Sequence, residues 1–170
     1  MTAAPQKAGL RNYLCVTAAY WSDTLTDGAL RMLVLFYFYD KGYSALAVAS
    51  LFLFYEVFGI ITNLFGGWLA ARFGLKATLF MGLGTQLTAI SLLAFAPPAW
   101  LTVTWVMVSQ AFSGIAKDLT KMSSKSAVKL VAGDSQSQLY KWVAILTGSK
   151  NALKGVGFFL GGLLLSVAGF

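Results

Sequence analysis

Long runs of apolar residues, separated by short polar breaks, dominate this chain. Five runs are long enough to cross a membrane core about 30 Å thick, which takes about 20 residues of helix. They cover residues 12–39, 44–70, 76–96, 100–121 and 140–169. Turn residues separate the first four runs, as Asp40-Lys41-Gly42, Arg72-Phe73-Gly74 and Pro97-Pro98. The pattern predicts an all-α integral membrane protein with five transmembrane helices, a polar leader at residues 1–11 and a polar loop at residues 133–138.

The composition agrees with this class. The chain is 58% hydrophobic and 11% charged, whereas soluble domains are about 45–50% apolar and 25% charged. Its 13 Lys and Arg outnumber its 6 Asp and Glu. These basic residues lie at or within apolar runs, so we expect no nucleic-acid partner. With one Cys and no His, and no nucleophile–base set, we expect no enzyme, metal or cofactor.

The distribution of basic residues near the run ends predicts the orientation. Only Lys41 lies in the short loops of one side, which marks the other side as cytoplasmic. On that side we place Lys7, Arg11, Arg72, Lys76, Lys125, Lys129 and Lys141. We therefore expect several passes through the lipid bilayer and a cytoplasmic amino terminus. Because five is an odd number of spans, we expect residues 12–170 to be part of a longer transmembrane protein.

Basic residues inside the runs suggest an interior that attracts anions. Lys150 and Lys154 are four residues apart, so they share a helix face. A charge at membrane depth costs about 2.5 to 17 kcal/mol and usually faces a protein or water-filled interior. We therefore favour a binding role for both lysines over a structural ion pair. Lys117 and Lys121 are further cavity candidates.

Acidic residues also lie inside the runs. Asp23, Asp27 and Arg31 follow at steps of four and form one polar stripe. Either Arg31 binds an anion while an acid exchanges protons, or Asp27 and Arg31 simply neutralise each other. Glu56 lies in the middle of the second run, where it is either a proton carrier or a neutral acid bonded to another helix.

Glycines recur within the second and fifth runs, and a basic loop follows the second run. Packing between helices is the favoured role of Gly59, Gly66, Gly67, Gly155, Gly157, Gly161 and Gly162. Residues 67–76 resemble the cytoplasmic loop signature of the major facilitator superfamily, Gly-x-x-x-Asp-Arg-x-Gly-Arg-Lys. Gly67, Arg72, Gly74 and Lys76 match, whereas Ala71 replaces the acid and Leu75 a base. The match implies a gating loop; the alternative is a basic turn that follows charge topology.

Several charged stretches together resemble one branch of that superfamily, the organoarsenical efflux permeases of the ArsJ type. They are residues 20–32, 52–56, 114–123 and 142–155. The resemblance covers nearly the whole chain. Because members have twelve spans, it implies an incomplete bundle, the amino-terminal portion without the sixth span and the second half.

The resemblance implies export of a small anionic organoarsenical, 1-arseno-3-phosphoglycerate, across the bacterial inner membrane. Glyceraldehyde-3-phosphate dehydrogenase forms it when arsenate replaces phosphate, so that enzyme is a functional partner and the export confers arsenate resistance. Lys150, Lys154, Lys117 and Arg31 are the expected substrate contacts, with Asp23, Asp27 and Glu56 as candidates for proton coupling. Two alternatives stay open: an antiporter for another organophosphate or drug, and a membrane assembly subunit that transports nothing.

Overall fold

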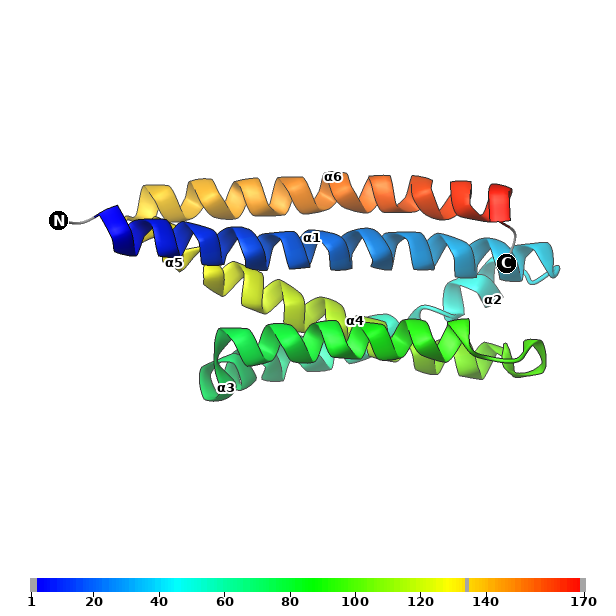
Figure 1. Ribbon diagram of the computed structural model, residues 1–170. Coiled ribbons are helices and arrows are strands. Elements are labelled where there is room, and N and C mark those ends of the chain that lie inside the picture. The colour runs from blue at the N-terminus through cyan, green and yellow to red at the C-terminus, as the bar shows by residue number, and fades with distance from the viewer. Residues whose placement is uncertain (1–2, 134, 169–170) are drawn as a thin grey trace.

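The computed structural model describes residues 3–133 and 135–168, and these residues form helices and short connections without any strand. This confirms the all-α class. The elements, shown in Figure 1, are α1 (Ala3–Asp40), α2 (Ala45–Ser50), α3 (Leu53–Ala94), the 3₁₀ helix η1 (Pro98–Trp100), α4 (Val103–Ala127), α5 (Lys129–Ala132) and α6 (Gln136–Ala168).

Helix α3 consists of two arms that meet at Gly74. This glycine has φ 82° and ψ 167°, a conformation that is essentially restricted to glycine because a side chain would clash. The chain turns back on itself at this end of α3 (Figure 1). The break predicted at residues 72–74 is therefore present.

Two other predicted breaks are also present, whereas some helix boundaries differ. A turn with Gly42 at φ 81° follows α1, and the proline pair leads into η1. However, α1 begins at Ala3 rather than residue 12, and α6 begins at Gln136 rather than residue 140. Hydropathy marks only the most apolar part of a helix. The residues that extend α1 include good helix formers such as Ala4, Gln6 and Lys7, and Pro5 lies in the first turn, where proline is tolerated.

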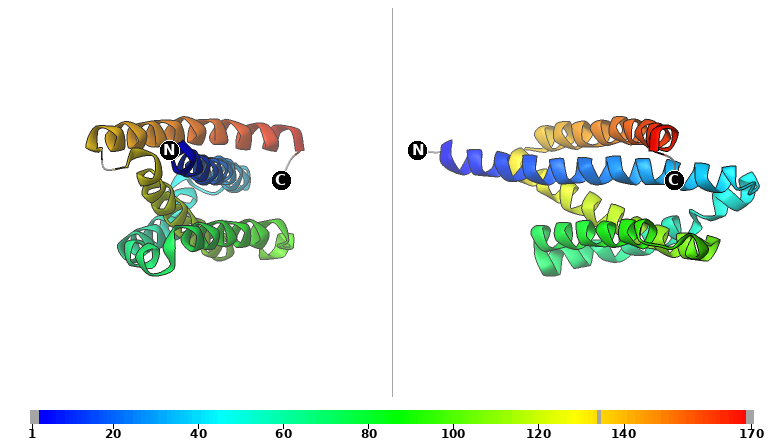
Figure 2. Two further views of the ribbon diagram at one scale, coloured as in Figure 1. Left: turned by 60° about the vertical axis from the view of Figure 1, so that its left-hand side comes forward. Right: turned by 45° about the vertical axis from the view of Figure 1, so that its right-hand side comes forward.

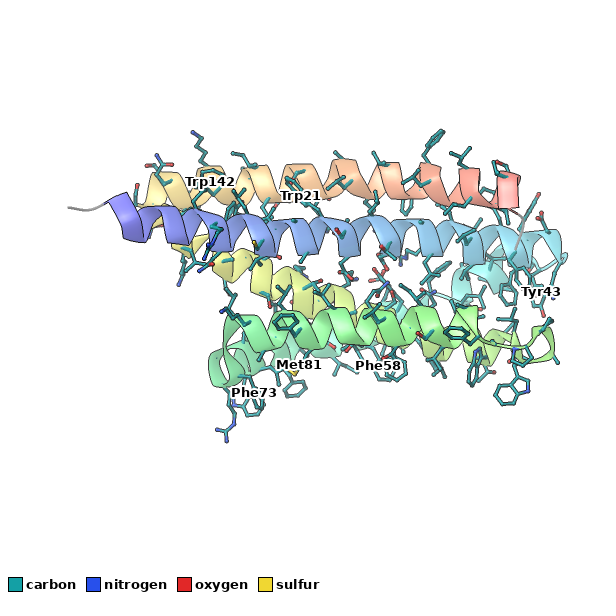
Figure 3. The ribbon with its side chains drawn as sticks, in the orientation of Figure 1. Trp21, Tyr43, Phe58, Phe73, Met81 and Trp142 are labelled. Atoms are coloured by element: carbon teal, nitrogen blue, oxygen red, sulfur yellow. The ribbon has the colours of Figure 1, made fainter. Side chains whose placement is uncertain are left out.

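The helices form two layers, in which α1 packs mainly on α6 and α3 mainly on α4 (Figures 1 and 2). Helix α4 also contacts α1 and so joins the layers. In the layer formed by α1 and α6, Trp21 of α1 donates a hydrogen bond from Nε1 to Ser149 Oγ of α6 at 3.0 Å. The rings of Tyr13 and Trp142 meet edge to face, with their centroids 5.3 Å apart. Figure 3 shows Trp21 and Trp142 where α1 and α6 lie side by side.

Glycines allow close approach at both helix pairs, but not all of the predicted ones take part. A Cβ on Gly157 would lie 2.5 Å from Leu25 O of α1, and Gly161 is equally close to the α1 backbone. Gly59 and Gly66 similarly face α4. The packing prediction is wrong for Gly67 and Gly155, since nothing lies within 4 Å of their Cβ positions, and Gly162 makes only a loose contact.

Polar side chains are buried in the middle of the bundle, while large apolar side chains cover the outside. Two apolar clusters lie toward the two ends of α1; the first includes Tyr13 and Tyr20, and the second Val34 and Phe38. Asp23 and Asp27 are buried between these clusters along α1. The exposed set includes Leu46, Ile60, Leu64, Phe65, Trp68, Phe73, Phe80, Phe95 and Phe159. Figure 3 shows Phe73 projecting away from α1 and α6.

One helical stretch among the described residues, Ala45–Ala94, is long and apolar enough to cross a membrane by length and composition alone. It comprises α2 and both arms of α3. Only 22% of its most apolar window is buried inside the protein. The arrangement with five spans stays a prediction.

Candidate functional site

Tyr55 of α3 lies at the centre of a polar cluster that joins α1, α3 and α4. Its side chain is fully buried, and its hydroxyl donates a hydrogen bond to Asp27 Oδ2 of α1 at 2.7 Å. Ser113 of α4 donates to the other carboxylate oxygen, Oδ1, at 3.1 Å. Asp27 thus has donors from two other helices, which fixes its position.

Gln86 extends this network into the second arm of α3. Its Oε1 lies 2.9 Å from Ser113 Oγ, while its Nε2 is buried without a hydrogen-bond partner in the described part of the chain. A hydroxyl carries one proton, which Ser113 uses on Asp27. Turning the Gln86 amide round lets Nε2 donate to Ser113 Oγ, which frees the Ser113 proton for Asp27 and leaves Oε1 as the amide atom without a partner.

Two cations lie over the ring of Tyr55. Arg31 Cζ of α1 is 4.0 Å from the ring centroid and Lys117 Nζ of α4 is 4.1 Å away. Each such contact contributes about 0.5–1 kcal/mol when it is exposed to water and about 2 kcal/mol when it is shielded from water. Tyr55 was not singled out from the sequence as a site residue. The signal was present, because a tyrosine in the middle of an apolar run needs a buried partner for its hydroxyl.

Glu56 bridges the same two cations. Its Oε1 accepts a hydrogen bond from Arg31 Nη2 at 3.0 Å, and its Oε2 lies 3.8 Å from Lys117 Nζ. Arg31 therefore pairs with Glu56, and the Asp27–Arg31 pair considered from the sequence is not among the ion pairs of the described residues. Both partners of Glu56 come from other helices, which explains why one sequence could not name them.

Asp23 has a different environment. Its Oδ2 is 2.7 Å from Thr120 Oγ1 of α4, but its Oδ1 is buried without a hydrogen-bond partner among the described residues. Neither Asp23 nor Asp27 forms an ion pair within that part of the chain. Of the three candidates for proton coupling, Glu56 is thus the one paired with cations.

Asp118 of α4 is a buried acid that the sequence did not identify as a site residue. It pairs with Lys121 on its own helix at 2.5 Å and lies 4.0 Å from Lys117 Nζ. Lys117 therefore lies between two acids, Glu56 and Asp118. A spacing of three along a helix was the available signal for the Asp118–Lys121 pair.

Lys150 and Lys154 of α6 are partly buried and form no ion pair with any described residue. The charge of Lys117 acts on both lysines, and each also has an acidic neighbour, Asp118 for Lys150 and Asp27 for Lys154. Lys150 also interacts with Lys121, and Lys154 with Arg31. Four of the predicted site residues, Arg31, Lys117, Lys150 and Lys154, are thus brought into one basic cluster, together with Lys121.

The predicted gating loop lies apart from this cluster. Arg72, Gly74 and Lys76 are exposed at the turn between the arms of α3, and Gly67 has open space around its Cβ position. Neither Arg72 nor Lys76 pairs with an acid in the described ranges. This position is compatible with either interpretation of the loop.

An open cavity of about 570 Å³ lies beside the basic cluster. Arg31 and Glu56 line it, and the other lining residues are mostly apolar, among them Phe52 and Phe158. Lys154 Nζ is 5.6 Å from the Phe158 ring, which places this lysine close to the cavity. Its size suits a small organic molecule.

No group of three or more His, Cys, Asp or Glu side chains that could hold a metal ion occurs among the described residues.

Known proteins add no family assignment. No family model matches the chain, and neither the search of curated proteins nor the search of solved structures finds a match.

Proposed function

We propose that this chain is the amino-terminal portion of a transporter of the major facilitator type. It exports an organic arsenical anion, 1-arseno-3-phosphoglycerate, across the bacterial inner membrane and so confers arsenate resistance. The observation that carries the proposal is the basic cluster, formed by Arg31, Lys117, Lys121, Lys150 and Lys154 from three helices.

A membrane location is supported by the reversed distribution of polarity. Polar side chains such as Asp23, Asp27 and Gln110 are buried, whereas many large apolar side chains are exposed. Lipid solvates an apolar exterior, and buried polar groups mark functional pathways in membrane helices. Helices α1, α4 and α6 and the two arms of α3 supply the five proposed spans.

Anion binding is supported by the unpaired lysines. Glu56 and Asp118 pair with the cluster residues Arg31, Lys117 and Lys121. In contrast, Lys150 and Lys154 form no ion pair among the described residues and have only the more distant charges of Asp118 and Asp27. Two half-buried ammonium groups that repel neighbouring cations are stabilised when an anion binds close to them. A phosphorylated organic acid supplies several negative charges for this purpose.

Proton coupling belongs to this proposal as its energy source. Asp23 and Asp27 are the candidates, since they are buried and held by hydroxyl groups rather than by cations. The loop with Gly67, Arg72, Gly74 and Lys76 is the proposed cytoplasmic gate. If uptake into inverted vesicles does not depend on a proton gradient, the proposal of proton coupling is wrong.

The experiment that tests the function is an arsenate resistance assay in cells that express the full-length protein. Lys150→Gln and Lys154→Gln keep a polar side chain but remove the charge, so we expect resistance to fall to the level of the empty vector while membrane insertion is retained. Lys129→Gln removes an exposed charge on α5 and serves as the matched control. Full resistance in both cluster variants contradicts the binding assignment.

One observation favours a second candidate, a major facilitator antiporter for another organic phosphate or drug. The cavity beside Arg31 has mostly apolar walls, which suit a substrate with an apolar part. Under this alternative, cells resist an amphiphilic anion rather than arsenate, and the same Lys154→Gln variant removes that resistance.

A further inference from the structure

We propose that Arg31 and Lys117 form a subsite for one oxyanion group of the substrate, and that the carboxylate of Glu56 occupies this subsite until the substrate displaces it. The inference rests on the proposed function in one respect, since it assumes that the basic cluster binds an anion. It gives Glu56 a new role, as a resident counter-anion rather than a proton carrier.

The two cations are held in place by the ring of Tyr55. That ring is fully buried, and its hydroxyl bond to Asp27 ties it to α1. Because Arg31 and Lys117 both lie within about 4 Å of the ring centroid, their charged groups are fixed relative to each other. A preorganised pair of cations binds an oxyanion with little cost in side-chain entropy.

Glu56 contacts the pair as a bound oxyanion would. Each of its two oxygens faces a different cation, at 3.0 Å from Arg31 Nη2 and 3.8 Å from Lys117 Nζ. The oxygens of a substrate carboxylate or phosphate have a similar spacing, so either group can replace this carboxylate. Arg31 Nε is buried and has no hydrogen-bond partner among the described residues, so the guanidinium keeps a donor that Glu56 does not use.

Glu56 is also more accessible to solvent than the two cations that it contacts. Its side chain is 58% exposed, compared with 17% for Arg31 and 24% for Lys117. Together with Arg31 it lines the open cavity of about 570 Å³. An incoming anion therefore reaches Glu56 without displacing the buried Tyr55, and the carboxylate can move aside into the cavity.

This arrangement has a functional consequence. Displacement of Glu56 lowers the net affinity for the substrate, and return of the carboxylate promotes release. A phosphate group carries more charge than the carboxylate that it replaces, so it competes effectively, whereas a neutral molecule cannot.

The test measures binding of 3-phosphoglycerate to the purified full-length protein in lipid nanodiscs by isothermal titration. Glu56→Gln removes the competing charge, so we expect its affinity for 3-phosphoglycerate to exceed that of the wild type by about tenfold. Glu56→Asp keeps the charge but shortens the side chain, so it can reach only one cation and should give a smaller increase. This second variant keeps a counter-charge for Arg31 and Lys117 and therefore protects folding. Asp40→Asn, which removes an exposed charge at the end of α1, is the matched control and should leave the affinity unchanged.

The outcomes separate this inference from the proposed function. If the wild type binds 3-phosphoglycerate and Lys150→Gln weakens binding, but both Glu56 variants bind no more tightly than the wild type, the subsite inference is wrong and the proposed function stands. If neither the wild type nor Glu56→Gln binds the anion, anion binding by the basic cluster is itself wrong. Tighter binding by both Glu56 variants, together with an unchanged Asp40→Asn control, supports the inference.

Discussion

Gly157 allows α6 to approach α1 closely, and replacing it should move the lysines of the basic cluster. A Cβ at this position would lie 2.5 Å from Leu25 O and 3.2 Å from Gly28 Cα. Both atoms belong to the α1 backbone and cannot turn away as a side chain can. Ordinary contact begins at 3.4 Å, so Gly157→Ala requires the two helices to separate by about 1 Å.

The expected cost follows from this overlap. Overpacking that shifts a backbone costs about 1–3 kcal/mol, whereas alanine gains about 0.5–1 kcal/mol over glycine in helix propensity. The overlap exceeds the gain, and we expect a net loss of about 1–2 kcal/mol. Because Lys154 lies one turn before Gly157 on the same helix, the displacement also carries this lysine away from Arg31 and should reduce transport.

Gly155 supplies a matched control on the same helix. Nothing lies within 4 Å of its Cβ position, so Gly155→Ala should be neutral or stabilise the protein. The assay is equilibrium unfolding of the purified full-length protein in mixed detergent micelles, with transport measured in parallel. Equal stability of Gly155→Ala and Gly157→Ala would refute the packing argument.

Two further predictions concern single side chains. Thr120→Val removes the hydroxyl beside Asp23 Oδ2 and leaves both carboxylate oxygens of this buried acid without a partner among the described residues. We expect a loss of about 1–3 kcal/mol in stability, measured by thermal unfolding. An unchanged melting temperature would contradict the assigned bond. Gly74→Ala forces a side chain into a conformation with φ 82° and should destabilise the turn by about 1–3 kcal/mol. The control is Gly67→Ala, which lies in open space on the same helix and should not destabilise the turn. The rate of protease cleavage at the turn distinguishes the two variants, and equal rates would contradict the strain at Gly74.

Much of the helical framework was predictable from local patterns. The turn at Gly74 and the breaks after Asp40 and before Pro98 follow from residues with special backbone preferences. The shared face of Lys150 and Lys154 follows from a spacing of four. The start of α1 was not predictable from hydropathy, because Gln6, Lys7 and Arg11 interrupt residues 3–11 and leave no long apolar run, although these residues still form helix.

The connections within the candidate site were less predictable because they depend on how the helices are rotated against one another. The stripe of Asp23, Asp27 and Arg31 was evident from spacing, but its partners lie on α3 and α4. Whether Arg31 pairs with Asp27 or Glu56 depends on the packing of those helices, which no pattern in one sequence defines. A buried tyrosine predicts some partner for its hydroxyl, but the three residues that Tyr55 contacts depend on the same packing and could not be named from the sequence.

The central claim is that the lysines of α6 bind an organic arsenical anion for export. The most direct measurement is uptake of 1-arseno-3-phosphoglycerate, generated in place from arsenate by glyceraldehyde-3-phosphate dehydrogenase, into inverted membrane vesicles that contain the full-length protein. We predict uptake by the wild type and by Lys129→Gln, and background uptake by the Lys150→Gln and Lys154→Gln double variant. Uptake by the double variant at the wild-type rate would contradict the account.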